Sequence, residues 1–145
     1  MSTKRRAEVS WEKDLAHGSG RVKLDSGALP EFPVTWASRA EAPAGKTSPE
    51  ELLAAAHASC FSMALSAGLG RIGKPPEHLT VSATATFDKV GDGWKVTTME
   101  LDVVGKVPGI DEAAFREAAQ KASTGCPISV ALHNNVEVRL NARLG

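Results

Sequence analysis

The stretch that decides the fold is Ser48-Pro49-Glu50-Glu51 followed by LLAAAHASCFSMALSAG, which ends at Gly68. An N-cap serine, a proline at the first helical position and an acidic residue at the third form a capping-box start for a helix. Apolar residues then recur at spacings of three and four, and others widen this stripe over most of the helix surface. The pattern predicts a long buried helix that runs to roughly Gly68 or Gly70.

The segments on either side of this helix alternate between apolar and polar residues, as strands do. The glycine and proline breaks between these segments predict hairpins and loops. The resulting order predicts an α+β fold with antiparallel strands, in one domain that spans residues 1–145. The expected elements are strands over 7–11, 21–24 and 32–36, a loop over 37–48, the long helix, strands over 81–90 and 94–107, a helix over 112–123, a helical turn opening at Cys126-Pro127, and a strand over 136–140.

A helix that is apolar on most sides needs cover on both faces. One six-stranded sheet in a chain of 145 residues covers one face easily. A second copy of the chain is the simplest cover for the other face. We therefore expect an obligate homodimer with the long helices in its interior.

The bulk composition excludes several classes of partner. Seventeen basic and seventeen acidic residues give a formal net charge of zero, so no strong field draws the chain to nucleic acid or an anionic membrane. The longest apolar stretch is interrupted by polar residues, and the first residues lead into charge rather than an apolar signal region. We expect a cytoplasmic protein with no nucleic acid partner, no membrane association and no bound cofactor.

Two cysteines in a reducing compartment are buried thiols, metal ligands or redox groups. Cys60 lies three turns into the apolar helix, where an unassisted thiolate is scarce. Cys126 lies between Gly125, which ends one helix, and Pro127, and this suits the first position of the next helix. There its sulfur faces unpaired N–H groups, which favour a thiolate.

A reactive thiolate at Cys60 requires a nearby cation. Arg39, in the polar loop before the helix, is the first candidate because arginine stays charged when partly buried, and Arg21 and Lys46 are weaker candidates. An arginine on a loop needs a carboxylate to fix its orientation. The capping box engages Glu51, which leaves Glu50 for the arginine; alternatively, both glutamates simply complement the helix dipole.

The spacing of Glu50 and Cys60 constrains where a shared site is assembled. Ten residues on a straight helix correspond to a rise of about 15 Å. The two side chains therefore do not readily share a site within one subunit. If both belong to one active site, Glu50 and with it Arg39 come from the partner chain.

The chain resembles the OsmC/Ohr family of osmotically inducible and organic hydroperoxide resistance proteins, and in particular its OsmC branch. The resemblance covers nearly the whole chain. It is carried by Ser48-Pro49-Glu50-Glu51-Leu52 leading through Ala54-Ala55-Ala56-His57-Ala58-Ser59 to Cys60-Phe61-Ser62-Met63-Ala64-Leu65, by Val107-Pro108-Gly109-Ile110-Asp111, and by Gly125-Cys126-Pro127-Ile128-Ser129.

The resemblance implies an intertwined homodimeric thiol peroxidase that prefers organic hydroperoxides and is recycled by dihydrolipoamide or a lipoylated protein. It implies that Cys60 is peroxidatic, that Cys126 resolves the product into a disulfide, and that Glu50 holds the active-site arginine. The OsmC branch takes this arginine from the loop before the long helix, which matches Arg39. The Ohr branch takes it from the first hairpin, near Arg21.

Two further expectations concern the surroundings of the cysteines. The apolar helix suggests a pocket lined by Phe61, Met63, Leu53 or Ile128 that favours bulky organic hydroperoxides over hydrogen peroxide. The alternatives to a peroxidase are a non-catalytic stress protein of the same fold and a zinc-binding protein. In the latter, the ligands are His57, Cys60, Cys126 and His133, although their spacing matches no compact zinc motif.

Overall fold

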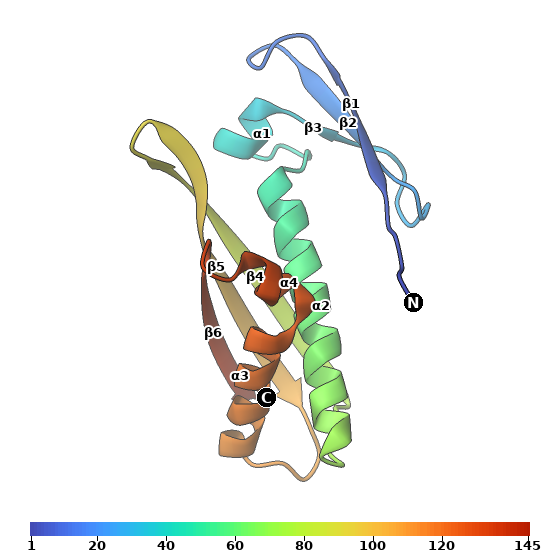
Figure 1. Ribbon diagram of the computed structural model, residues 1–145, viewed down its shortest axis with the longest axis vertical. Helices are drawn as coiled ribbons and strands as arrows, with labels where there is room; N and C mark the ends of the chain where they lie inside the picture. Colours follow the sequence, from blue (N-terminus) through green and yellow to red (C-terminus); the bar gives the residue numbers. More distant parts are fainter. The chain divides into compact units, whose positions relative to one another are not determined.

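The chain forms six strands and four helices in the computed structural model, which describes residues 1–145 (Figure 1). They divide into two compact units, residues Met1–Leu52 and Leu53–Gly145. The α+β class, the antiparallel pairing of all but the last strand and the long helix agree with the prediction. The elements are β1 (Ala7–Glu12), β2 (Ser19–Leu24), β3 (Phe32–Val34), α1 (Trp36–Ala40), α2 (Pro49–Arg71), β4 (His78–Val90), β5 (Gly93–Lys106), α3 (Glu112–Gly125), α4 (Pro127–Leu132) and β6 (Glu137–Leu144).

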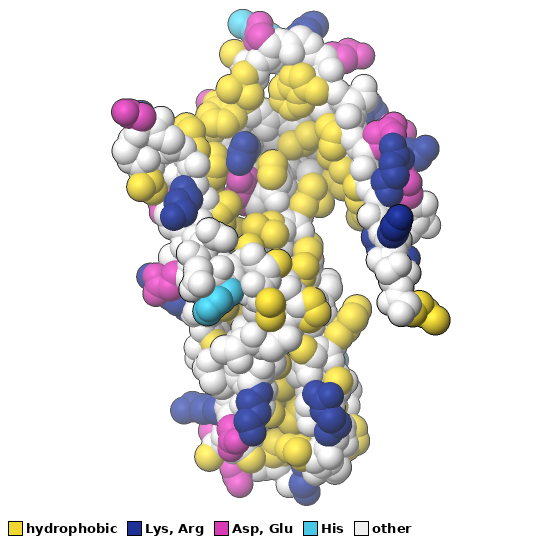
Figure 2. Space-filling model, in the orientation of Figure 1, with side chains coloured by type: hydrophobic (Ala, Val, Ile, Leu, Met, Phe, Trp, Pro, Cys, Tyr) yellow, Lys and Arg dark blue, Asp and Glu magenta, His cyan; other side chains and the backbone are white.

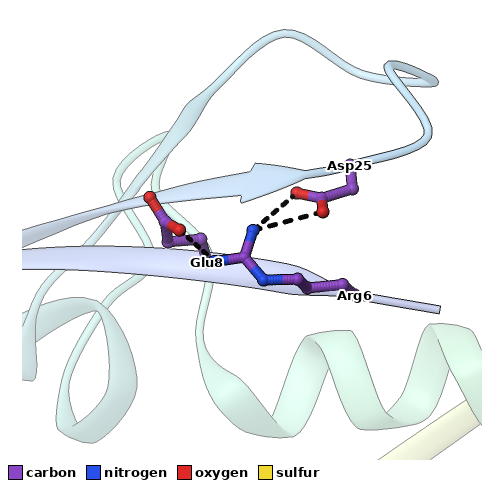
Figure 3. Close-up of polar contacts among 3 residues, drawn as sticks. All are labelled: Arg6, Glu8 and Asp25. Carbon is purple, nitrogen blue, oxygen red and sulfur yellow. Dashed lines mark hydrogen bonds and ion pairs between the residues drawn. The ribbon is translucent and has the colours of Figure 1, made fainter. Parts of the chain in front are cut away.

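The first unit is built on an antiparallel sheet with the strand order β1-β2-β3. At Gly20, a Cβ atom would lie 2.8 Å from a methyl group of Val34, so this close approach of the strands requires glycine. Arg6 clamps the open end of the hairpin, where its guanidinium contacts both Glu8 and Asp25 (Figure 3). These side chains are exposed, so the clamp contributes little stability.

The predicted loop over residues 37–48 contains a short helix, α1, which the sequence analysis missed. The third strand also ends at Val34 rather than at Trp36. Thr35 and Ser38 form a reciprocal capping box, and the Ser38 hydroxyl additionally donates to the Thr47 carbonyl at 2.7 Å. A serine replaces the usual Glu or Gln of that motif, and therefore this helix start lacks the common signature.

The long helix α2 begins as predicted and extends one residue past Gly70. The Glu51 amide donates to the Ser48 hydroxyl at 3.1 Å, while the Glu51 carboxylate accepts from Thr47 at 2.6 Å instead of returning to the backbone of Ser48. By length and composition alone, α2 could cross a membrane. This is weak evidence, because core helices share that composition.

Only one face of α2 is buried within a single chain. That face carries Ala54, His57, Phe61, Leu65 and Leu69. The opposite face is exposed and consists largely of small residues and methionine, with Met63 72% exposed. Hydrophobic side chains are accordingly visible at the surface along α2 (Figure 2). Within one chain, one face of the helix is covered, as predicted, and cover of the other face by a second copy of the chain stays a prediction.

The second unit places α3 and the buried face of α2 against a sheet with the order β4-β5-β6 (Figure 1). Its core contains Phe61, Leu65 and Leu69 of α2 together with Leu101, Val103 and Phe115. The expected single six-stranded sheet is instead two sheets of three strands. β6 pairs parallel to β5, because α3 and α4 form the crossover that returns the chain in the same direction.

Candidate active site

Both cysteines are free thiols, and they lie next to each other in the second unit. Cys60 is half-buried on α2, whereas Cys126 is fully buried between α3 and α4. Burial raises the pKa of the Cys60 thiol, and a side-chain hydrogen bond with Cys126 raises this pKa further. The Ile128 backbone amide acts against both effects and lowers the pKa. The chain thus holds a reduced dithiol, with an amide donor at the more accessible sulfur.

From the sequence, Cys126 was expected at the first position of this helix; it is instead the N-cap of α4, one residue before the first helical position. Pro127 takes that first position, which suits proline because the missing N–H has no helical partner there. The predicted environment of the sulfur is present. The Ser129 amide donates to Cys126 Sγ at 3.3 Å, and the Ser129 hydroxyl lies 3.1 Å from the same atom.

Ser129 also contacts His57, so that a buried polar chain leads from α2 to Cys126. His57 Nε2 lies 2.7 Å from Ser129 Oγ, and both residues are almost fully buried. Burial lowers the pKa of His57, so its imidazole stays neutral. From the sequence, His57 was expected only as a possible metal ligand, and no role was expected for Ser129. The spacing of three residues from Cys126 was the available signal, since an N-cap and the third helical residue share one turn.

Arg39 and Glu50 form a tight ion pair within the first unit. Arg39 Nε lies 3.1 Å from both Glu50 oxygens, and Nη2 lies 2.7 Å from Oε1. The Glu50 side chain is 9% exposed and that of Arg39 32%, and the guanidinium lies 5.9 Å above the Trp36 ring. A buried carboxylate that fixes the arginine fork provides the orientation expected of an anion-binding guanidinium.

The other two candidate cations lie in different surroundings. Arg21 pairs with Glu31 at 3.1 Å on the open surface, where the two side chains are 62% and 48% exposed. Lys46 is exposed in the loop before α2. Of the three, Arg39 alone is oriented by the glutamate that the sequence analysis selected.

The zinc alternative is not supported by the arrangement of its ligands. His57, Cys60 and Cys126 come together, but no group of three or more His, Cys, Asp or Glu side chains is arranged to hold a metal ion. His133, the fourth proposed ligand, is exposed at the C-cap of α4.

The expected apolar pocket along α2 is not formed by the predicted residues. Phe61 is fully buried in the core, whereas Met63, two positions along, faces outward. An apolar cavity of about 340 Å³ lies instead in the first unit, beside the ion pair. Its lining consists of Val9, Trp11, Leu15, Val22, Val34, Thr35, Trp36, Arg39, Pro49 and Leu52.

Comparison with known proteins agrees with the fold. The family described as OsmC-like protein matches residues 42–141. Peroxiredoxin OsmC of Escherichia coli (strain K12) is 40% identical over 144 residues, 99% of each chain. The organic hydroperoxide resistance protein of Xanthomonas axonopodis pv. citri (strain 306) is 32% identical over 65% of each chain. The crystal structure of the organic hydroperoxide resistance protein OhrB of Bacillus subtilis is 26% identical, with a TM-score of 0.76 over 95% of this chain and 98% of that one.

An α+β fold with a long cysteine-bearing helix and a second cysteine at a helix start defines a class of dithiol proteins. Within that class, the chain belongs to the OsmC-like family. The names of its relatives support a peroxidase-type enzyme with a peroxide-related stress function.

Proposed function

We propose that the protein is a thiol-dependent peroxidase that reduces organic hydroperoxides through Cys60 and Cys126. The observation that carries the proposal is the reduced dithiol itself. The two thiols share a hydrogen bond, and the more accessible one receives the Ile128 amide. The nearness of the two sulfurs supports a Cys60–Cys126 disulfide as the oxidised product.

The reaction has two steps at these sulfurs. The Cys60 thiolate attacks the distal peroxide oxygen, and the O–O bond breaks. Cys60 becomes a sulfenic acid, and the alkoxide takes a proton from water and leaves as the alcohol. Cys126 then attacks the Cys60 sulfur. The S–O bond breaks, and the departing hydroxide takes up the proton that Cys126 released on becoming a thiolate and leaves as water. A dithiol of the dihydrolipoyl type, free or attached to a protein, reduces the resulting disulfide by exchange.

The cation that stabilises the Cys60 thiolate is Arg39 of a second copy of the chain, in a homodimer. Glu50, which holds Arg39, lies ten residues before Cys60 on the same helix, which corresponds to a rise of about 15 Å. Burial raises the pKa of Cys60, so the thiolate needs a nearby cation. The exposed apolar face of α2 supports such a dimer, because it provides a surface for a partner.

The preference for organic peroxides is supported by the apolar cavity beside Arg39. Trp36 and Leu52 are among its lining side chains, and Arg39 supplies the charged group at its wall. An alkyl or aryl group bound there would leave its peroxide oxygens at the guanidinium. Hydrogen peroxide has no apolar group to bind, so this cavity gives it no advantage. Two redox-active thiols suit a reducing compartment, and we place the protein in the cytoplasm.

Mass spectrometry of the intact protein tests this proposal. After one equivalent of cumene hydroperoxide, the wild-type protein should lose two hydrogens as the disulfide forms. Cys126→Ser should instead gain one oxygen on Cys60, and Cys60→Ser should remain unchanged. Retention of both thiols in the wild-type protein, with the peroxide unconsumed, would refute the proposal. Faster consumption of hydrogen peroxide than of cumene hydroperoxide would refute the role of the cavity.

A further inference from the structure

A buried row of hydrogen-bonding groups ends on the sulfur of Cys126. It runs from His57 Nε2 to Ser129 Oγ over 2.7 Å, and from Ser129 Oγ to Cys126 Sγ over 3.1 Å. All three side chains are at most 5% exposed. We propose that Ser129 and His57 form a donor chain that stabilises the attacking form of Cys126 and so speeds closure of the disulfide, an inference that rests on the proposed function.

The unpaired ring nitrogen of His57 fixes the direction of this chain. Nδ1 is buried and has no hydrogen-bond partner. Because a buried N–H without an acceptor is rarer than an unpaired lone pair, the hydrogen of the neutral imidazole lies on Nε2. Nε2 then donates to Ser129 Oγ, and the hydroxyl hydrogen of Ser129 is free to point at Cys126 Sγ.

The Cys126 sulfur consequently receives two donors from one residue, the amide and the hydroxyl of Ser129. Hydrogen bonds to a charged form favour that form, so both donors favour the thiolate that must attack Cys60. His57 touches Ser129 and not a reacting atom, so it is a positioning residue. It withdraws electron density from the hydroxyl and thereby strengthens the donor that reaches the sulfur.

The donor chain acts on closure and not on the reaction with peroxide. Its hydrogen bonds reach Cys126, whereas the backbone donor at Cys60 is the Ile128 amide. Ser129→Ala removes the hydroxyl without adding volume and keeps the backbone amide. Closure should slow about tenfold, the factor expected for losing one hydrogen bond to a charged group, while sulfenic acid formation at Cys60 keeps its wild-type rate.

A single-turnover experiment separates the two steps. Samples quenched with dimedone after one equivalent of cumene hydroperoxide report the sulfenic acid, and the intact mass reports the disulfide. A Ser129→Ala closure rate within about twofold of wild type would overturn the inference, because the lost donor should cost more than this. Equal slowing of both steps would also overturn it, since a merely structural defect has no preference for closure.

Two substitutions of His57 test its donor role. The side-chain amide of His57→Gln can still donate to Ser129 but cannot serve as a base, whereas His57→Leu can do neither. We expect His57→Gln to close at nearly the wild-type rate and His57→Leu to close as slowly as Ser129→Ala. Equal slowing by Gln and Leu would overturn the donor assignment.

Oxidation with diamide keeps the test independent of peroxidase activity. Diamide forms an adduct with the Cys60 sulfur, and Cys126 displaces the reduced diamide as a hydrazine while the disulfide forms. If the donor chain acts as proposed, this adduct should accumulate in Ser129→Ala and not in the wild-type protein. Slower closure with diamide in a protein that ignores hydroperoxides would support the donor chain and refute the peroxidase proposal. Unchanged closure with diamide would overturn the donor chain.

Discussion

Replacing Arg39 with methionine tests which arginine serves the site. Glu50, 7% exposed, would lose a partner that contacts it through three nitrogen–oxygen distances of 2.7 to 3.1 Å. Breaking a fully buried pair costs about 3–5 kcal/mol. The Arg39 side chain is 32% exposed, so water screens part of this, and we expect a loss of about 2 kcal/mol in the free energy of unfolding.

Arg21→Met is the matched control, because the pair of Arg21 with Glu31 has a similar separation of 3.1 Å. Its side chains are 62% and 48% exposed, so its loss should cost at most about 0.5 kcal/mol. Urea unfolding followed by tryptophan fluorescence measures both values. In a cumene hydroperoxide assay, Arg39→Met should lower kcat/KM about 100-fold, since it removes a charge that stabilises the transition state, and Arg21→Met should not. Equal losses of activity, or a larger loss at Arg21, would refute the assignment.

Three further predictions concern pH and packing. Burial lowers the pKa of His57, so below the unfolded pKa of about 6.5 the unfolded chain binds a proton that the folded chain excludes. The free energy of unfolding is therefore highest above that pKa and falls as the pH drops towards the folded pKa. His57→Gln should make this fall smaller in urea titrations at pH 7 and pH 5. Burial raises the pKa of Cys60 in the single chain, and the proposed role of Arg39 is to lower it. The pH at which iodoacetamide alkylates Cys60 at half its maximal rate should therefore be higher in Arg39→Met than in wild type. An unchanged value would show that Arg39 does not act on the Cys60 thiol. A Cβ atom on Gly105 would lie 2.5 Å from the Phe115 ring, so Gly105→Ala should lower stability by about 1–3 kcal/mol, and an unchanged melting temperature would contradict this packing.

Local sequence signals predicted α2 well and the features that depend on distant residues poorly. Ser48 and the spacing of apolar residues lie within the helix or next to it, so its start could be predicted to the residue. The helix α1 depends partly on a hydrogen bond from Ser38 to Thr47, nine residues away. The parallel pairing of β6 depends on a crossover through α3 and α4, which a pattern of alternation cannot reveal.

The candidate site likewise contains one contact that the local sequence predicted and one that it did not. The pairing of Arg39 with Glu50 followed from a short argument about which glutamate the helix cap leaves free. The contact of His57 with Ser129 joins residues 72 positions apart. Neither residue type nor spacing indicates such a contact, because histidine and serine occur in many unrelated surroundings. The fold had to bring α2 against α4 before this chain of donors could be seen.

A mixture of two inactive variants tests whether the site is shared between subunits. Cys60→Ser keeps Arg39 but lacks the attacking sulfur, and Arg39→Met keeps the sulfur but lacks the cation. If Arg39 acts on the partner's sulfur, each mixed dimer holds one complete site. Equal amounts that re-pair at random give half mixed dimers, so activity should recover to about a quarter of wild type after the subunits are dissociated and reassembled together. If both residues act within one chain, no dimer in the mixture holds a complete site, and activity that stays at the level of the separate variants after confirmed exchange would show that Arg39 does not act across the interface.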